Sequence, residues 1–453
     1  MRYLSQIFQP VITIPKGAII KNTEITCKSQ KVIYLQIYFT LKCIFHDSNM
    51  LLLECGLIRP TTSGFFTILP LARRALDKLE LLVNSCLESV QAQRISLPCL
   101  TSANLWEKTG RLDSVGSELF TIKDRHDKKY LLAPTHEEAI ADLIADVGPL
   151  SHKQLPLLLY QITNKYRDEL RPKHGLLRAR EFTMMDLYGF HSNIQCAHNT
   201  YSRVTEVYRR LFDLLDLPVH RLVAPTGEMG GSLSHEWQLP ALAGEDSINI
   251  CPSCSHVQRS GECEKCASET DVVQTVEVGH TFILGTKYSE PLQAKCIHPD
   301  SNPSPLIMSC YGIGITRLLA ASLEALSSDS QIRWPKCIAP FAAIVIGPKE
   351  GSKEWSKHGL NHIEGVARKL DGILKDDVLL DDRHTLTIGK RLLMADRMGY
   401  PHIIVCGRNS IETPPRYELY TNGRREPILG DINELMDMIN GVSDTQRDRS
   451  RSE

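Results

Sequence analysis

The chain has 453 residues, more than one hydrophobic core usually serves, so we expect two or three domains. Hydrophobic residues make up 42% of the chain and charged residues 23%, which is typical of a globular, soluble protein. The net charge of −1 gives no global sign of nucleic-acid binding, so any contact with RNA would rest on local basic patches, and no run of about twenty apolar residues predicts a membrane span.

The N-terminal part has the least regular pattern. Its first ten residues, MRYLSQIFQP, contain one arginine and are too short and too apolar for a convincing transit peptide. The stretch 31–53 shows neither helical nor alternating periodicity. From residue 63 the pattern becomes regular: SGFFTILP is followed by LARRALDKLELLVNSCLESV, which predicts an amphipathic helix of roughly 20 residues with Pro70 at its start.

Thr135 and Glu137, in APTHEEAI, stand two residues apart and share one face if the chain is extended there. A hydroxyl acceptor beside a carboxylate suits a secondary ammonium group, which offers two protons and one positive charge. Alternatively, Thr135 caps a helix over 136–146 and Glu138 completes a capping box. Both interpretations can hold at once.

The segment 160–191 is the most informative part of the chain. It reads YQITNKYRDELRPKHGLLRAREFTMMDLYGFH and predicts two strands joined by a turn. Side chains repeat every two residues along a strand, so Arg167 would share a face with Glu169, and Arg180 with Phe182. A guanidinium can bind a phosphate, a carboxylate can accept from an amino group, and a phenyl ring can cover a purine. The alternative is a charged hairpin on a solvated face.

Two further segments carry candidate ligand contacts. EVGHTFILGTKYS, residues 277–289, places Glu277, His280 and Phe282 near one pocket wall, although a lone histidine is more often structural. MSCYGIGITRLLAASLEAL, residues 308–326, reads as a strand, glycines and a helix. Arg317 falls in the first turn of that helix, where a cation opposes the helix dipole, so a ligand for this arginine is suggested.

Four of the fourteen cysteines form CPSC-x8-CEKC, with Cys251, Cys254, Cys263 and Cys266. Paired CxxC knuckles bring four thiolates within tetrahedral reach of a zinc ion, and such a closed shell leaves no catalytic position. The alternative is a set of thiols without metal. The other ten cysteines lie singly among apolar neighbours, as small buried side chains do in a reducing compartment.

The C-terminal hundred residues alternate between strands and helices. We expect strands near 340–346, 378–380 and 402–405, and helices near 358–373 and 388–398, which predicts a small α/β domain with a mixed sheet. The last residues, 441–453, read as a solvated, disordered tail.

The segment 160–191 resembles the second signature motif of class II aminoacyl-tRNA synthetases, and most of all that of the prolyl enzymes of bacterial and mitochondrial type. The resemblance rests on YRDE, RP, and REF followed by MxDxYxF. The strand and helix from residue 63 resemble motif 1, GIGITR resembles motif 3, and VLLDDR, IGKRL and GYPHIIV resemble the anticodon-binding domain of the family. Lys173, His174 and Met185 depart from the usual residues, which bears on contact with the tRNA acceptor end rather than on ATP binding.

The resemblance implies roles for the nucleotide-binding residues. Arg167 would hold the α-phosphate and the substrate carboxylate, Glu169 would help to seat the adenine, and Phe182 would stack on it. Arg180 would make a further phosphate contact. Arg317 would meet the γ-phosphate and cover the other face of the adenine, so that Arg167 and Arg317 are the expected catalytic residues.

The resemblance also implies roles for the amino-acid pocket. Thr135 and Glu137 would contact the imino group of proline, and His280 with Phe282 would form the apolar wall for its ring. Glu277 would bind ATP and Mg²⁺.

Two intervals differ from the pattern of the resembled family. Residues 32–49 interrupt an otherwise continuous match, and we interpret them as a gene-model insertion; the alternative is a genuine extra strand pair. Residues 247–276 stand where bacterial-type prolyl enzymes carry a large editing domain, so that domain is expected to be absent and replaced by the CxxC module.

We therefore expect an N-terminal segment over 1–60, a class II catalytic domain over 61–335 with an antiparallel sheet flanked by helices (an α+β fold), and an anticodon-binding domain over 340–440. The resemblance implies a homodimeric, mitochondrial prolyl-tRNA synthetase that uses ATP, Mg²⁺, L-proline and tRNA(Pro), with a cytoplasmic location as the alternative. Alternative functions are a non-catalytic tRNA-binding paralogue and another class II synthetase such as the threonyl enzyme.

Overall fold

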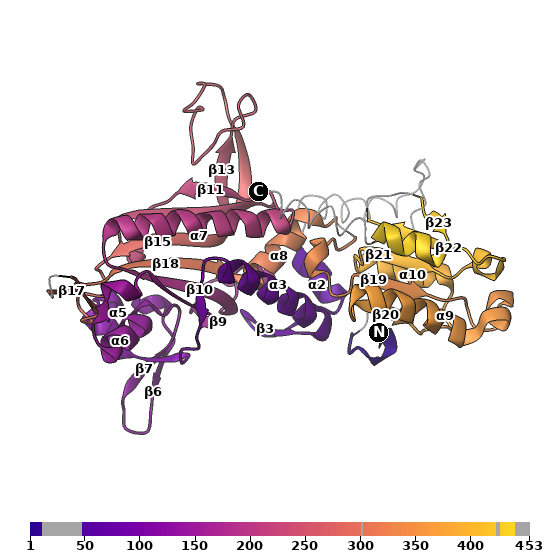
Figure 1. Ribbon diagram of the computed structural model, residues 1–453, viewed down its shortest axis with the longest axis horizontal. Coiled ribbons are helices and arrows are strands. Elements are labelled where there is room, and N and C mark those ends of the chain that lie inside the picture. Colours follow the sequence, from indigo (N-terminus) through magenta and orange to yellow (C-terminus); the bar gives the residue numbers. More distant parts are fainter. Residues whose placement is uncertain (11–47, 300–301, 329, 423–425, 440–453) are drawn as a thin grey trace, which may run out of the picture. The chain divides into compact units, whose positions relative to one another are not determined.

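A computed structural model describes residues 1–10, 48–299, 302–328, 330–422 and 426–439 (Figure 1). The chain divides into two compact units. Unit 1 consists of Met1–Arg59, Ile68–Lys78 and Leu326–Glu453, and unit 2 of Pro60–Thr67 and Leu79–Ala325. Of the suspected insertion, residues 32–47 lie outside the described residues, as does the tail from 441.

Unit 2 is built on a large, mostly antiparallel sheet. Its strands follow the order β11-β12-β15-β18-β10-β9-β4, with β13 and β14 attached beside β15. These strands are β4 (Gln93–Arg94), β9 (Leu157–Tyr166), β10 (Glu181–His191), β11 (His220–Val223), β12 (Leu233–Pro240), β13 (Asp246–Ile250), β14 (Val257–Gln258), β15 (Asp271–Gly285) and β18 (Ile307–Gly314). The predicted class II fold, an antiparallel sheet flanked by helices, is confirmed.

Smaller elements complete the surroundings of this sheet. They are the hairpin β2 (Ile58–Thr62) and β3 (Phe65–Ile68), the sheet of β5 (Leu100–Ser102), β6 (Thr121–Lys123) and β7 (Lys129–Leu132), the sheet of β8 (Leu150–Ser151), β16 (Lys295–Ile297) and β17 (Pro303–Pro305), and the helices α4 (Ala103–Lys108), α5 (Arg111–Ser114), α6 (Glu137–Val147), α7 (Ile194–Leu214) and α8 (Ile315–Leu326).

Apolar residues on both faces make β10 a central strand. Met185, Leu187, Tyr188 and Phe190 are all fully buried there. The long helix α7 covers one face and contacts β10, β15 and β18, as Figure 1 shows. On the other side Tyr188 and Phe190 join a core cluster with Ile140 of α6. The core therefore fixes β10, β15 and β18, the strands that carry most of the candidate site.

Unit 1 contains a six-stranded mixed sheet in the order β1-β20-β19-β21-β22-β23, as the strand and helix alternation predicted. Its elements are β1 (Arg2–Tyr3), α2 (Ser48–Glu54), β19 (Ala343–Ile346), α9 (Lys353–Leu374), β20 (Val378–Asp381), α10 (Ile388–Arg397), β21 (His402–Val405), β22 (Tyr417–Thr421) and β23 (Ile428–Gly430). The helix α3 (Pro70–Glu88) begins at the predicted proline.

Helix α9 begins earlier than the predicted residue 358. The Ser352 side chain accepts from the backbone N–H of Trp355 at 3.1 Å and caps the new start. Gly359 then interrupts the helical dihedral angles with a φ of 59°, so two helical segments join at the point where the periodicity suggested a beginning. Among the described residues, every helix is too short or too polar to span a bilayer.

Candidate active site

A cavity of about 420 Å³ opens in unit 2 above the central strands, a volume within the range of small-molecule sites. Its lining includes these residues predicted from the sequence: Thr135, Glu137, Arg167, Phe182, Glu277, His280, Phe282 and Arg317. Glu169 and Arg180 do not line the cavity. One cavity thus brings together side chains from β10, β15, α6 and α8 that are far apart in the chain.

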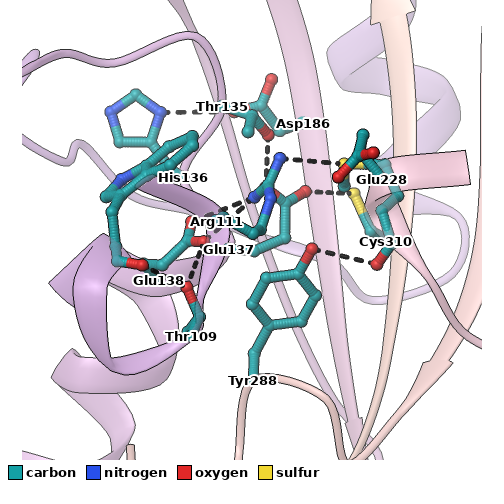
Figure 2. A network of polar contacts seen from close by, with 12 residues as sticks. Thr109, Arg111, Thr135, His136, Glu137, Glu138, Asp186, Glu228, Tyr288 and Cys310 are labelled. Atoms are coloured by element: carbon teal, nitrogen blue, oxygen red, sulfur yellow. Dashed lines mark hydrogen bonds and ion pairs between the residues drawn. The ribbon is translucent and has the colours of Figure 1, made fainter. Parts of the chain in front are cut away.

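Glu137 forms the acidic end of the cavity (Figure 2). The Thr135 hydroxyl donates to its Oε2, and the Cys310 thiol donates to its Oε1 at 3.0 Å. Arg111 Nη1 lies 3.0 Å from Glu138 Oε1 and 3.8 Å from Glu137 Oε2. Two buried carboxylates face one guanidinium, so this group carries a net negative charge when both glutamates are ionised. It therefore suits a bound ammonium group.

The capping box considered for α6 is wrong. His136, not Thr135, is the N-cap residue, and its side chain makes no capping hydrogen bond. The Thr135 hydroxyl donates to Glu137. Glu138 accepts hydrogen bonds from Arg111 and from the Thr109 hydroxyl, the latter at 3.1 Å. Both glutamates still lie in the first turn, where the helix dipole favours negative charge.

Burial raises the pKa of both ionisable neighbours of Glu137, Glu138 and Cys310. Burial raises the pKa of Glu138, although the charge of Arg111 acts to lower it. Burial, and then the charge of Glu137, raise the pKa of the Cys310 thiol well above its ordinary value. Cys310 therefore stays protonated near neutral pH and acts as a hydrogen-bond donor to Glu137.

Asp186 lines the cavity and anchors a buried polar network. Its Oδ2 accepts from Lys165 Nζ at 2.8 Å, from Gln161 Nε2 at 3.2 Å and from the Tyr188 hydroxyl at 3.1 Å. The backbone N–H of His136 donates to the Tyr188 oxygen at 3.1 Å. This network ties β9 and β10 to the start of α6, and thereby fixes the position of Glu137.

A second group in the cavity lining is cationic and aromatic. The Arg167 guanidinium carbon lies 5.2 Å from the centre of the Phe182 ring. Arg317 Nε donates to the Leu177 carbonyl at 2.9 Å, and its Nη1 donates to the Glu277 carbonyl at 3.3 Å. Burial, and then the charge of Arg317, lower the pKa of Arg167 from its ordinary value, although a guanidinium remains charged. Two cations beside an aromatic ring suit a nucleoside triphosphate.

The predicted strands of 160–191 are too long at the turn. β9 ends at Tyr166 and β10 begins at Glu181, so Arg167, Glu169 and Arg180 lie in the connecting loop. The loop bends inward because Leu176 and Leu177 are buried, with exposures of 4% and 7%. A backbone bond from Arg167 N–H to the Arg180 carbonyl, 2.9 Å long, still joins its two ends.

Glu169 and Arg180 contact the loop itself. Glu169 Oε2 accepts from Arg178 Nε at 2.8 Å. Arg180 Nε donates to the Glu169 carbonyl at 3.0 Å, and its Nη2 lies 3.3 Å from Asp168. Their roles toward ATP remain predictions.

His280 is held from both sides of its ring. Its Nδ1 lies 3.0 Å from Glu277 Oε1, its Nε2 lies 2.6 Å from the Ser234 hydroxyl, and its ring stacks on Phe282 with centroids 4.0 Å apart. Burial acts to raise the pKa of Glu277, but His280, Arg317 and Arg167 outweigh it and the net pKa lies below its ordinary value. Glu277 therefore stays ionised at neutral pH.

Sequence reasoning did not single out several residues of the site. These are Arg111, Asp186, Ser234 and Cys310. The strings MxDxYxF and MSCYGIG contain Asp186 and Cys310, so a ligand could have been suspected for each, whereas no string given above contains Ser234. Arg111 stands in an ordinary short helix, and nothing in its neighbourhood marks it.

The four cysteines of the CxxC pairs lie together in the module beside β13, outside the cavity. One sulfur from each falls within 4.8 Å of the others.

Known proteins match this chain over most of its length. Residues 120–326 match the class II core domain of the tRNA synthetases for G, H, P, S and T, and residues 342–441 match an anticodon-binding domain. The chain is 40% identical to the probable mitochondrial proline--tRNA ligase of Homo sapiens over 97% of this chain and 91% of that protein. The chain belongs to the proline--tRNA ligase family.

Other relatives are similar over most of their length. The probable mitochondrial enzyme of Schizosaccharomyces pombe is 36% identical over 85% of this chain and 94% of its own. The fold resembles the prolyl-tRNA synthetase of Giardia lamblia, with a TM-score of 0.74 and 19% identity, over 88% of this chain and 75% of that one. This membership disfavours the threonyl alternative and confirms the expected class.

Proposed function

We propose that this chain activates L-proline with ATP and transfers the prolyl group to tRNA(Pro). The observation that supports this most is the polarity of this cavity, whose lining has a net negative group at Glu137 and a cationic, aromatic group at Arg167, Arg317 and Phe182. An amino acid needs the first for its ammonium group, and a nucleoside triphosphate needs the second. Membership in the proline--tRNA ligase family selects proline.

In the proposed reaction a carboxylate oxygen of proline attacks the α-phosphorus of ATP, and pyrophosphate leaves. Arg167 neutralises charge on the α-phosphate and orients the carboxylate, while Arg317 neutralises charge on the γ-phosphate. Phe182 and Arg317 hold the adenine between them. Displacement at phosphorus needs positioning and charge neutralisation rather than a covalent enzyme intermediate, so these cations supply most of the rate.

Recognition of proline follows from the group at Glu137. Thr135 and Glu137 accept the two protons of the secondary ammonium group, and the stacked pair His280 and Phe282 forms an apolar wall for the ring. The terminal ribose hydroxyl of tRNA then attacks the carbonyl carbon of prolyl-adenylate, and AMP leaves. In this proposal residues 61–335 form the catalytic domain and 340–440 bind the anticodon.

ATP and Mg²⁺ are the cofactors that class II synthetases use. Carboxylate oxygens of Glu277 and Glu236, beside His280, form an oxygen-rich group that fits Mg²⁺. The ion would neutralise phosphate charge there. The proposal also includes a structural zinc ion at Cys251, Cys254, Cys263 and Cys266, which is supported by their thiolate chemistry.

The proposed setting is the mitochondrial matrix, supported by the mitochondrial names of the relatives. The proposed assembly is a homodimer, supported by the motif 1 strand β3 and helix α3. Sedimentation of the purified protein would measure the dimer.

ATP–pyrophosphate exchange with each of the twenty amino acids tests the function. Proline should support exchange far above all others, and purified tRNA(Pro) should then become charged. A protein that binds tRNA(Pro) but exchanges no pyrophosphate with any amino acid would favour the non-catalytic paralogue instead.

A further inference from the structure

The cysteine module, residues 246–275, projects from the large sheet beside β15 (Figure 1). Between Cys251 and Thr270 its only branched aliphatic side chain is that of Val257. Such a segment buries too little apolar surface to offset the conformational entropy lost when it becomes ordered. Its fold therefore needs another source of stability.

The two cysteine pairs form the same turn twice. Cys251 N–H donates to the His256 carbonyl at 2.9 Å, and Ser255 N–H donates to the Cys251 carbonyl at 2.8 Å. Twelve residues later, Cys263 and Ala267 repeat both bonds, at 2.9 and 2.7 Å. The fifth residue of each turn, Ser255 or Ala267, has a φ of 56°, which L-residues adopt rarely. Two matching turns present their sulfur atoms to one common point.

The distances between these sulfurs suit a metal better than a disulfide. Sγ atoms of Cys251 and Cys266, of Cys254 and Cys263, and of Cys254 and Cys266 are each 3.5 Å apart. A disulfide bond is about 2.05 Å long. Four sulfurs at about 2.3 Å from a tetrahedral zinc ion lie about 3.8 Å from one another, close to the separations here.

We propose that Cys251, Cys254, Cys263 and Cys266 bind one Zn²⁺, and that this ion holds the module so that Arg259 positions Glu236 beside Glu277 and His280 of the active site. The first part is independent of the proposed function, and the second part rests on it. Four thiolates close the coordination shell, so the ion is structural.

Arg259 stands between the two cysteine pairs and reaches the catalytic sheet. Its Nη2 forms an ion pair with Glu236 of β12, and its Nε donates to the Val223 carbonyl of β11 at 3.5 Å. Gln258, next to it, is 7% exposed, and its Nε2 donates to the Ser260 and Glu262 carbonyls, both at 2.8 Å. The loop that carries Arg259 is therefore tied to the metal turns.

Glu236 does not line the cavity itself but lies next to Glu277 and His280, which do. One donor atom of Glu236, one of Glu277 and one of His280 lie within 4.8 Å of one another. Two carboxylates at this distance repel each other unless cations balance them. His280 contacts Glu277, and Arg259 pairs with Glu236. Arg259 thus holds Glu236 beside Glu277 and balances its charge, so that both carboxylates face one site for Mg²⁺.

Metal analysis of the full chain, purified without chelator, tests the zinc site. We expect one zinc per chain, and Cys263→Ser should lose it while Cys337→Ser, a matched cysteine outside the module, keeps it. Replacement of zinc by Co²⁺ should give the thiolate-to-cobalt absorption of tetrahedral sites, so the test does not depend on folding of a variant. Less than a tenth of an equivalent of zinc per chain, together with no cobalt spectrum, would overturn the proposed zinc site. This holds whether the four thiols are then found reduced or in disulfide bonds.

Pyrophosphate exchange at varied ATP and Mg²⁺ tests the positioning role. Arg259→Gln should keep one zinc and the parental melting temperature, yet raise the KM for ATP several-fold and require more Mg²⁺, with the KM for proline unchanged. Arg259→Lys should recover most of the loss. Parental ATP and Mg²⁺ dependence in Arg259→Gln would refute the role. If the parental chain showed no exchange with proline, the proposed function would fail, while the zinc content would still decide the metal site.

Discussion

In the proposed function, recognition of the proline ammonium group rests on Glu137. It accepts from Thr135 and from Cys310 at 3.0 Å, and Arg111 is shared with Glu138. Glu137→Gln keeps the shape but removes the charge. A charge-assisted hydrogen bond contributes about 1.5–3 kcal/mol, so the KM for proline should rise roughly 10- to 150-fold in pyrophosphate exchange. The KM for ATP should change little. An unchanged KM for proline would show that Glu137 does not contact the substrate.

His191 offers a residue-scale test of stability against pH. Burial lowers its pKa from 6.5 to about 4, and its Nε2 lies 2.9 Å from the Ser309 hydroxyl. Because the folded-state pKa is the lower one, the unfolded chain takes up the proton first. The stability that His191 contributes is thus full above about pH 6.5 and falls as the pH decreases toward 4, by about 3 kcal/mol in total.

Urea unfolding at pH 7, 6, 5 and 4 measures this slope. His191→Gln should unfold with a smaller loss of stability between pH 6.5 and 4 than the parental chain. Identical slopes would show that His191 titrates alike in both states.

Sequence reasoning found most residues whose chemistry is visible in a motif and missed those defined by packing. Thr135, Arg167, Phe182 and Arg317 were assigned from short strings, and all line the cavity. Arg111 is nearly buried at 4% exposure and reaches Glu138 across a sequence separation of 27 residues. No local pattern specifies such a long-range partner, because the contact exists only when α5 and α6 are packed together.

At the scale of elements, strong hydrophobic periodicity predicted the helices and strands better than capping and turn residues predicted where they begin and end. The buried strand β10 and the helix at Pro70 follow directly from apolar patterns. The ends of β9 and β10 at the turn were misplaced because burial of Leu176 and Leu177 overrides strand pairing. The capping box at Thr135 was wrong because the site uses that hydroxyl for Glu137. Local propensity was thus overruled where a tertiary contact or the site competes for the same group.

The pairing of β9 with β10 is tested by the buried ion pair of Lys165 and Asp186. Their charged atoms lie 2.8 Å apart, with side-chain exposures of 0% and 3%. Lys165→Met leaves Asp186 without its cation, and such a loss costs about 3–5 kcal/mol in the free energy of unfolding. Urea denaturation should show that decrease. The double variant with Asp186→Asn should recover part of it, and a single variant as stable as the parent would mean that the pair is not formed.

At the scale of the whole molecule, unit 1 unites segments from opposite ends of the sequence. Arg2 pairs with Leu379 and Tyr3 with Leu380, so the N-terminal residues extend the sheet of the C-terminal region. A two-residue strand carries no periodicity, and the sequence therefore could not reveal this pairing. The alternation of strands and helices over the last hundred residues, by contrast, predicted the mixed sheet.

The module at 246–275 has a consequence for fidelity of the whole enzyme. Alanine is smaller than proline, and an apolar pocket discriminates against a missing methylene by only about 1–3 kcal/mol. From the sequence, no editing domain is expected at residues 247–276, and this interval of about thirty residues holds the cysteine module. We expect measurable alanyl-adenylate in exchange assays and no hydrolysis of alanyl-tRNA(Pro). Deacylation above the spontaneous rate would reveal an editing centre.

Arg167 tests the central claim, that this cavity forms prolyl-adenylate. It lies over Phe182 at 5.2 Å and near Arg317, where the α-phosphate would bind. Losing one such cation costs on the order of 3 kcal/mol, so Arg167→Ala should exchange pyrophosphate with proline at least about a hundredfold more slowly. Affinity for tRNA(Pro) should stay near the parental value, because it depends on many phosphate contacts and on anticodon bases. Exchange at the parental rate in Arg167→Ala would contradict the account.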